Sequence, residues 1–209
     1  MVNGKSSRSK KAMREHGGMK RAFFAALALS AFIFAAGAPV SAIQRPSVVT
    51  PDTPYIEAIR KGDLDTIKAE LTRGTRIDTR DKLGRPALIV AIMFGERDIA
   101  HYLLEQGARP DLKDKSGNSA LCYIAQSGNA VLGEALLKAG ADPDRTCEER
   151  ETPIIIAARA GHEELVDLLI EYKADLEASD LTGRTALSLA RDRRHRGIVK
   201  ALETAGASY

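Results

Sequence analysis

Residues 152–162 read TPIIIAARAGH, and this stretch predicts the fold of most of the chain. It opens on Thr-Pro, continues through apolar and small residues and stops at Gly-His, a pattern that predicts a short helix buried along one side. The position of Thr152 recurs at a constant interval of 33 residues, at Thr53, Pro86, Ser119 and Thr185. A fixed interval of this length is typical of solenoids, in which each unit stacks on its neighbours.

Each unit combines a turn, the helix that follows it and a second helix. An Asp-x-x-Gly turn, in which the Asp side chain can bond its own backbone and the Gly can adopt positive φ, precedes the first helix of three units. These turns are Asp81–Gly84, Asp114–Gly117 and Asp180–Gly183. The second helices carry Ile and Leu in a repeating pattern, as at Ile99, Leu103 and Leu104, which indicates burial along one stripe.

The interval, the turns, the helix openings and the Gly-Ala-Asp ends together resemble the ankyrin repeat, whose mark is a T-P-L-H-x-A core repeated about every 33 residues. The resemblance covers residues 53–209. It implies an all-α fold, an α-solenoid of about five helix–turn–helix units with β-hairpin finger loops. We expect the repeats to span residues 53–80, 81–113, 114–146, 147–179 and 180–209.

The two terminal repeats and the fourth turn depart from this pattern. The first unit lacks the preceding turn and has Glu70 where later repeats have Leu, and the last has Glu203 where three preceding repeats have an apolar residue, so both are expected to be caps. Pro86 removes the hydroxyl that usually starts the helix. In the fourth turn, Cys147 and Arg150 replace the Asp and the Gly, so we expect this finger to differ in shape.

The first 42 residues predict a secretory signal peptide. A Lys-Arg pair precedes an uncharged run of 17 residues, 22–38, and the small residues Val40 and Ala42 stand at positions −3 and −1 of a cleavage site. Translation from Met19 would give an ordinary 24-residue signal, and cleavage would leave an extended linker over residues 43–52. The alternative is an uncleaved membrane anchor, although the apolar run is shorter than the ~20 residues that span a bilayer.

The positive net charge of the chain, +3, resides in its N-terminal segment. Residues 1–42 hold seven of the 31 Lys and Arg and one of the 28 acidic residues, so the remainder carries a net charge of −3. We therefore expect no nucleic-acid partner. A signal peptide before ankyrin repeats resembles the small exported proteins of Gram-negative bacteria, which implies a periplasmic location; retention at the inner membrane and secretion are the alternatives.

The two cysteines, Cys122 and Cys147, lie 25 residues apart in the third and fourth repeats. Cys122 occupies the His position of the repeat motif. In the ankyrin fold that side chain points toward the turns, so the resemblance implies that the two sulfurs can meet. Exported proteins with an even cysteine count are commonly disulfide-bonded. In the alternative, Cys122 is a small buried residue and Cys147 is an unrelated exposed thiol.

No motif predicts catalysis, a cofactor or a metal site. GxSxG, HExxH, P-loop and GxGxxG sequences are absent, and the histidines of the repeats, His101, His162 and His195, lie in three different units. We therefore expect a protein that is not an enzyme. The Arg-rich run at residues 191–196 has two interpretations, a solvated face of the last repeat or a docking site for an anion.

In the ankyrin family, partner contacts come from the finger tips and from the inner face of the first helix of each repeat. Carried onto this sequence, these positions are Lys82, Leu83, Arg85, Met93, Phe94, Lys115, Asn118, Gln126, Glu148, Glu149, Glu151, Arg159, Arg184 and Arg193. Met93 and Phe94 form an apolar pair that we expect to be exposed, and such pairs often anchor interfaces. The alternative for Phe94 is packing against its neighbouring repeat. The fourth finger is acidic between basic neighbours, which suits oriented docking of a charged partner.

The sequence therefore predicts a monomeric, non-enzymatic module that binds a protein partner through its concave face and finger loops. Among the exported proteins that it resembles, one role is to support a periplasmic stress enzyme such as catalase. Another is immunity against a toxin delivered to the periplasm, such as a lipase. A secreted effector that acts on host proteins is a third interpretation.

Overall fold

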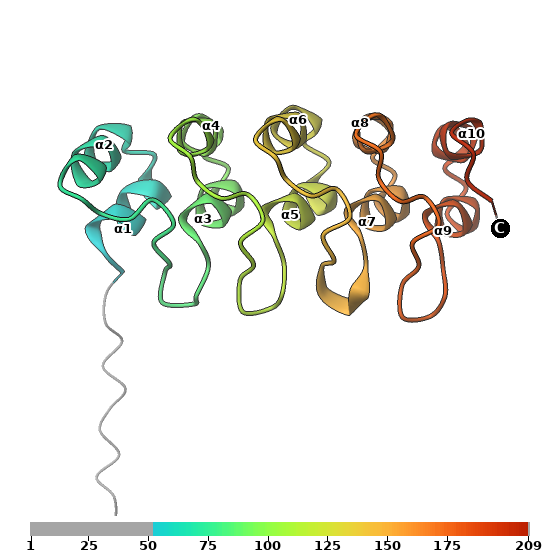
Figure 1. The fold of residues 1–209 in the computed structure, drawn as a ribbon, viewed down its shortest axis with the longest axis horizontal. Coiled ribbons are helices and arrows are strands. Elements are labelled where there is room, and N and C mark those ends of the chain that lie inside the picture. The colour runs from blue at the N-terminus through green and yellow to red at the C-terminus, as the bar shows by residue number, and fades with distance from the viewer. Residues whose placement is uncertain (1–51, 209) are drawn as a thin grey trace, which may run out of the picture. The chain divides into compact units, whose positions relative to one another are not determined.

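The computed structural model describes residues 52–208, which form an all-α repeat solenoid. Five helix pairs follow one another along the chain: α1 (Pro54–Lys61) and α2 (Leu64–Thr72), α3 (Ala87–Phe94) and α4 (Arg97–Glu105), α5 (Ala120–Ser127) and α6 (Ala130–Lys138), α7 (Pro153–Ala160) and α8 (Glu163–Glu171), and α9 (Ala186–Asp192) and α10 (Arg196–Thr204). The pairs lie side by side, and finger loops project beyond the first helices α3, α5, α7 and α9 (Figure 1). The predicted signal peptide and all but the last residue of the predicted linker lie outside the described residues.

The loops before α3 and α9 each contain one isolated β-bridge where the family resemblance implied β-hairpins. Arg80 pairs with Pro86, and Ser179 pairs with Thr185, in each case antiparallel and at the base of a loop. Residues 52–208 contain no strand longer than these single bridges. The fourth finger instead contains a short 3₁₀ turn, η1 (Glu148–Arg150).

The first helix of each pair begins and ends at residues suited to those positions. The Thr53 hydroxyl accepts a hydrogen bond from the Ile56 N–H at the start of α1. Pro86 makes no such bond at the start of α3, as its missing hydroxyl predicts. Glycines with φ between 73° and 86° end α1, α3, α5 and α7. In the last repeat, Arg193 ends α9 and Arg194 has a φ of 63°.

One apolar core runs through the stack because equivalent positions are buried in every repeat. The residue two places after the Thr152-equivalent position is at most 2% exposed throughout: Tyr55, Leu88, Leu121, Ile154 and Leu187. In the second helices, the equivalent leucines have no exposed surface: Leu103, Leu136, Leu169 and Leu202. Each repeat therefore buries its apolar stripe against its neighbours, which is the main source of stability in a solenoid.

Polar contacts between repeats recur at the same interval as the apolar ones. In four successive connections a carboxylate accepts a hydrogen bond from a backbone N–H 31 residues later: Asp78 from Arg109, Asp111 from Asp142, Asp144 from Asp175 and Glu177 from Ser208. Histidine contributes a second series, because the His162 ring bonds the Gln126 carbonyl and the His195 ring bonds the Arg159 carbonyl. These bonds hold the register between consecutive repeats.

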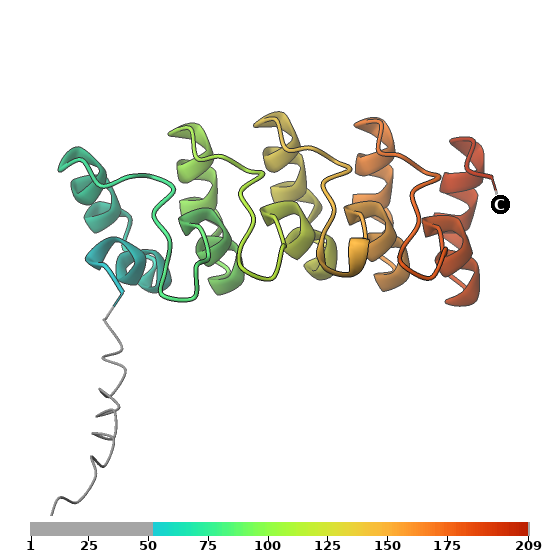
Figure 2. The ribbon, with the colours of Figure 1, turned by 60° about the horizontal axis from the view of Figure 1, so that its bottom comes forward.

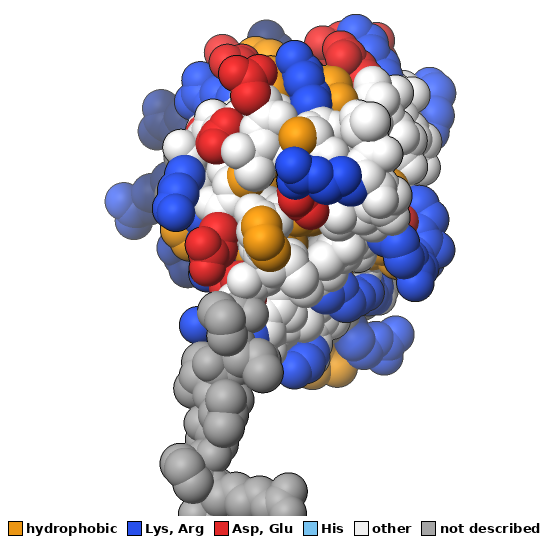
Figure 3. Space-filling model, turned by 90° about the vertical axis from the view of Figure 1, so that its left-hand side faces the viewer, with side chains coloured by type: hydrophobic (Ala, Val, Ile, Leu, Met, Phe, Trp, Pro, Cys, Tyr) orange, Lys and Arg blue, Asp and Glu red, His pale blue; other side chains and the backbone are white. Residues whose placement is uncertain are grey.

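The first repeat carries the features expected of a cap. Its end of the solenoid shows Lys, Arg, Asp and Glu side chains interspersed with small apolar areas (Figure 3). Glu70 stands where later repeats bury a leucine, and its carboxylate bonds Arg73 at 2.6 Å and the Thr75 hydroxyl at 3.0 Å. A paired carboxylate at this position suits a surface that no other repeat within residues 52–208 covers.

Candidate functional site

The first helices and the finger loops share one surface, which we call the inner face (Figure 2). Two depressions lie on it at the third repeat. The larger, of about 390 Å³, is lined by Ile92, Met93, Tyr123, Gln126 and Ser127. The smaller, of about 230 Å³, is lined by Asn118, Gln126, Cys147, Glu148, Glu149, Glu151, Ile156 and Arg159. Gln126 lines both, so the two depressions adjoin.

The Met93–Phe94 pair ends α3 at the edge of the larger depression. Met93 is 45% exposed and Phe94 is 48% exposed, which confirms the expected exposure. The Arg60 guanidinium lies 5.4 Å from the centre of the Phe94 ring, a cation–π contact with the preceding repeat. Arg60 is itself bound to Asp52 and to Asp81, so its position is well defined. Phe94 therefore contacts its neighbouring repeat and still presents half of its surface.

Tyr123 forms part of the larger depression and was not among the predicted contact residues. Its hydroxyl donates a hydrogen bond of 2.6 Å to Asp114, and burial together with that carboxylate raises the pKa of Tyr123 to about 12. The hydroxyl therefore stays protonated at neutral pH. An aromatic residue three positions before Gln126 on the same helix was the available signal, since positions i and i+3 share a helix face.

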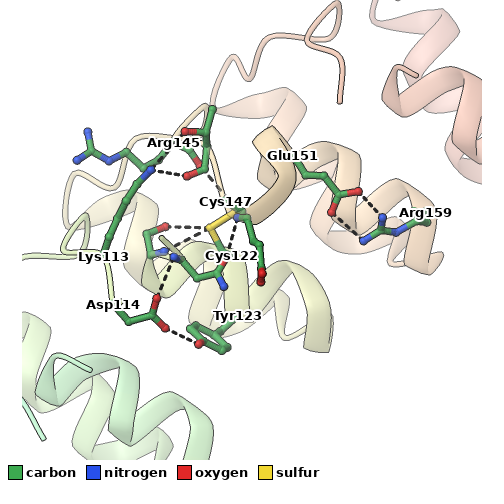
Figure 4. The surroundings of a disulfide bond; sticks show 12 residues. Lys113, Asp114, Cys122, Tyr123, Arg145, Cys147, Glu151 and Arg159 are labelled. Carbon is green, nitrogen blue, oxygen red and sulfur yellow. Dashed lines mark hydrogen bonds and ion pairs between the residues drawn. A yellow bond between two sulfur atoms is a disulfide. The ribbon is translucent and has the colours of Figure 1, made fainter. Parts of the chain in front are cut away.

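A disulfide joins Cys122 to Cys147 across the third and fourth repeats (Figure 4). The two Cα atoms are 5.8 Å apart, Cys122 has no exposed surface and Cys147 is 8% exposed. The structure thus shows the paired arrangement and not the two unrelated thiols. Asn118 adds a second connection, because its side-chain oxygen accepts a hydrogen bond of 3.0 Å from the Glu148 N–H.

The disulfide stands where the other fingers use an aspartate. Asp81 accepts hydrogen bonds from the N–H groups of Leu83 and Arg85, and Asp114 and Asp180 accept the equivalent pairs in their own fingers. Cys147 has no carboxylate to offer, yet its N–H still donates to the Glu151 carbonyl at 2.7 Å and closes the loop. The covalent bond therefore holds the base of this finger in place of two charge-assisted hydrogen bonds.

The fourth finger differs in shape from its siblings, as the loss of its Gly predicted. Arg150 occupies the Gly position with a φ of 59°, and Glu149 beside it has a φ of 57°. Two consecutive non-glycine residues in the left-handed region cost free energy, about 1–2 kcal/mol each. The result is a compact tip on which Glu148 and Glu149 are both exposed.

The structure buries two of the predicted contact residues. Glu151 is 6% exposed and Asn118 is 5% exposed. Both Glu151 oxygens bind the Arg159 guanidinium, which comes from the following helix (Figure 4). These side chains are occupied within the fold, where they position the finger and α7. Sequence position alone did not reveal the pairing, because Glu151 and Arg159 are eight residues apart and belong to a loop and a helix.

The remaining predicted contact residues divide into exposed and bound side chains. Arg85 and Arg184 form ion pairs with the aspartate of their own finger, at 2.7 and 2.9 Å. The exposed members, besides Arg184, are Lys82, Leu83, Met93, Phe94, Lys115, Gln126, Glu148, Glu149 and Arg193. The two depressions bring together members from the second, third and fourth repeats, whereas Arg193 lies apart in the last repeat.

Repeated helix pairs with projecting loops and a continuous core define a repeat solenoid. A family model described as ankyrin repeats (3 copies) matches residues 55–147 and 121–209. The chain therefore belongs to the ankyrin repeat family, whose repeats form protein–protein interaction modules and generally do not catalyse reactions. A comparison with curated proteins finds no match.

The described part of the chain has neither a cluster of metal ligands nor a membrane-spanning helix. Residues 52–208 contain no group of three or more His, Cys, Asp or Glu side chains arranged to hold a metal ion. Within the same range, none of the helices has the length and apolar character needed to cross a membrane.

The finger aspartates predict how stability depends on pH. The Thr182 hydroxyl, two backbone N–H groups and Arg184 outweigh burial and lower the pKa of Asp180. A carboxylate with a depressed folded-state pKa stabilises the fold above the unfolded-state pKa and loses that contribution as the pH falls. We expect Asp180→Asn to lower the free energy of unfolding at pH 7 by about 1–2 kcal/mol, and the difference from wild type to shrink below about pH 4.

Urea unfolding followed by circular dichroism between about pH 7 and pH 2 measures this difference. Other titrating groups cancel in the comparison, including Asp144, whose pKa is raised chiefly by burial. A difference between wild type and variant that stays constant over the whole range would contradict the assignment of Asp180.

Proposed function

We propose that this protein is exported to the periplasm and there binds a protein partner along its inner face. The observation that carries the proposal is the exposed Met93–Phe94 pair beside two adjoining depressions. Met93 and Phe94 are adjacent and about half exposed, so they present apolar surface to water. Binding of a partner would bury this surface and gain free energy. Arg60 fixes the Phe94 ring, which reduces the entropy lost when the ring enters an interface.

The charges of the finger tips support an oriented partner. Lys82 and Lys115 are exposed on the second and third fingers, and Glu148 and Glu149 are exposed on the fourth. A partner with the opposite order of charges would approach faster and in one direction along the solenoid. The apolar pair would then supply most of the affinity, because hot spots in interfaces are few and largely apolar or aromatic.

The disulfide supports an oxidising compartment, and the N-terminal sequence supports export. Mass spectrometry of the protein recovered from the periplasmic fraction tests this location. We expect a chain that begins at Ile43. Protein found only in the cytoplasm, or a chain that retains residues 1–42, would contradict cleavage after Ala42.

For the biological role we propose support of a periplasmic stress enzyme such as catalase, with immunity against a toxin such as a lipase as the alternative. A photo-crosslinking amino acid in place of Met93 tests where the partner binds and identifies it. The matched control carries the same amino acid in place of Asp98, which is exposed on α4. We expect a crosslinked protein from position 93 and none from position 98. Equal crosslinking from both positions would exclude the inner face, and a host protein in the adduct would favour a secreted effector.

A further inference from the structure

A second site lies at the C-terminal end of the solenoid, away from the two depressions of the inner face. A cavity of about 490 Å³ opens beside α9 and α10 and is lined by Arg191, Arg194, Arg196, Val199, Lys200 and Glu203. Four of these six residues are cations and one is an acid. The cavity therefore has an excess of three positive charges, in a repeat domain whose net charge is negative.

The position of the cavity follows from the end of the stack. In the fourth repeat, the positions equivalent to Arg191 and Val199 are Ala158 and Val166, which have no exposed surface. In the fifth repeat Arg191 instead binds Glu203 at 2.7 Å across α9 and α10, and Val199 is partly exposed. The ion pair replaces an apolar contact surface, so the cavity at the last repeat is lined by charged side chains and by Val199.

Three of the cations at this cavity have no partner among residues 52–208. Arg194, Arg196 and Lys200 are exposed, and their side chains form no hydrogen bond or ion pair with any residue between 52 and 208. Lys200 also lines a neighbouring depression together with Glu163 and Asp167. These two carboxylates reduce the contribution of Lys200 to the positive potential of the cavity. Arg194 and Arg196 therefore define the site most directly.

Arg194 is held in a conformation that favours glycine. Its φ is 63°, and the equivalent residues Gly95, Gly128 and Gly161 have φ values of 77°, 73° and 86°. A side chain at Gly128 or Gly161 would meet the histidine of the next repeat, and no repeat follows the fifth within the described residues. That absence removes the steric obstacle to a side chain but leaves the backbone strain. A glycine at this position would relieve the backbone strain, so Arg194→Gly is expected to remove the guanidinium without disturbing the fold.

We propose that this cavity binds a compact, multiply charged anion of the phosphate type. One guanidinium group can donate two parallel hydrogen bonds to two oxygens of a phosphate. Several cations without an ion-pair partner within residues 52–208 around one cavity favour a ligand with more than one negative charge. A single carboxylate would leave most of this charge uncompensated. Val199 also lines the cavity and could contact the organic part of a phosphate ester. The same chemistry is found in soluble phosphate esters and in anionic lipid headgroups.

The test uses inorganic pyrophosphate as the soluble probe and phosphatidylglycerol vesicles as the lipid probe. Isothermal titration calorimetry at low salt measures pyrophosphate binding to the protein purified from cells that express the full chain. The test variant is Arg194→Gly/Arg196→Ala, which removes two cations and relieves the positive φ of Arg194, so we expect it to fold. The matched control is Lys173→Gly/Arg97→Ala. Lys173 is an exposed cation with a φ of 64°, and Arg97 begins α4 as Arg196 begins α10.

We expect saturable binding to the wild type, a loss of at least ~10-fold in affinity for the test variant and a change below ~2-fold for the control. Glu203→Gln removes the acid from the cavity and is expected to bind ~2- to 5-fold more tightly. Binding to phosphatidylglycerol vesicles alone, lost in the test variant, would support a lipid headgroup as the source of the phosphate. Equal weakening of both double variants, or no saturable binding to either probe, would overturn the proposal.

Discussion

Replacing both cysteines, as Cys122→Ala/Cys147→Ala, is expected to lower the free energy of unfolding by about 3 kcal/mol. The disulfide spans 25 residues, and opening a loop of this size returns conformational entropy to the unfolded chain. Chemical denaturation with and without reductant measures the loss, and the reduced wild type is expected to unfold like the variant. A variant as stable as the oxidised wild type would contradict this contribution.

A second set of variants tests why the disulfide stands at this finger. In the Cys122→Ala background, Cys147→Asp with Arg150→Gly restores the turn residues of the other fingers. The new carboxylate is expected to accept the N–H groups of Glu149 and Glu151, as Asp81 does in its own finger. Part of the lost stability, about 1–2 kcal/mol, should return. No recovery would show that the disulfide does not substitute for the aspartate.

The variant Met93→Ser/Phe94→Ser is expected to weaken binding of the crosslinked partner at least ~30-fold, which corresponds to about 2 kcal/mol. Both side chains are about half exposed, so their replacement removes little of the core. The cation–π contact with Arg60 is also lost, at a cost to stability of about 0.5–1 kcal/mol.

Val131→Ser is the matched control for this variant. Val131 is 71% exposed on α6, a second helix outside the inner face, and its replacement removes exposed apolar surface of a similar kind. Its affinity for the partner is expected to stay within ~2-fold of wild type, because the residue lies outside the proposed interface. Calorimetry with the purified partner measures both variants. Similar affinities for the two would show that Met93 and Phe94 are not the anchors.

The repeat architecture was predictable from sequence because it depends on a pattern that recurs five times. A departure from the motif at a single position, such as Pro86 in place of Thr, does not hide an interval of 33 residues. The helix ends were equally predictable, since glycine in the left-handed region ends four of the first helices. The shape of the fingers was less predictable. Hairpins were implied, but the loops before α3 and α9 pair only through one isolated bridge each.

The candidate site was only partly predictable because exposure depends on contacts between repeats. The contact positions of the ankyrin family, carried onto this sequence, included Met93 and Phe94, which are exposed. They also included Glu151 and Asn118, which the fold buries, since their partners lie elsewhere in the chain. They did not include Tyr123, whose place beside Met93 depends on how the third repeat packs against the second. A repeat pattern shows which positions are equivalent, but it does not show which side chains of different segments bond to each other.

Hydrogen–deuterium exchange of the chain with and without its crosslinked partner tests the central claim most directly. Binding along the inner face predicts slower exchange at the end of α3, at the end of α5 and in the fourth finger, with the second helices α4, α6 and α8 unchanged. Slower exchange confined to those second helices, with no protection at Met93 or in the fourth finger, would contradict it.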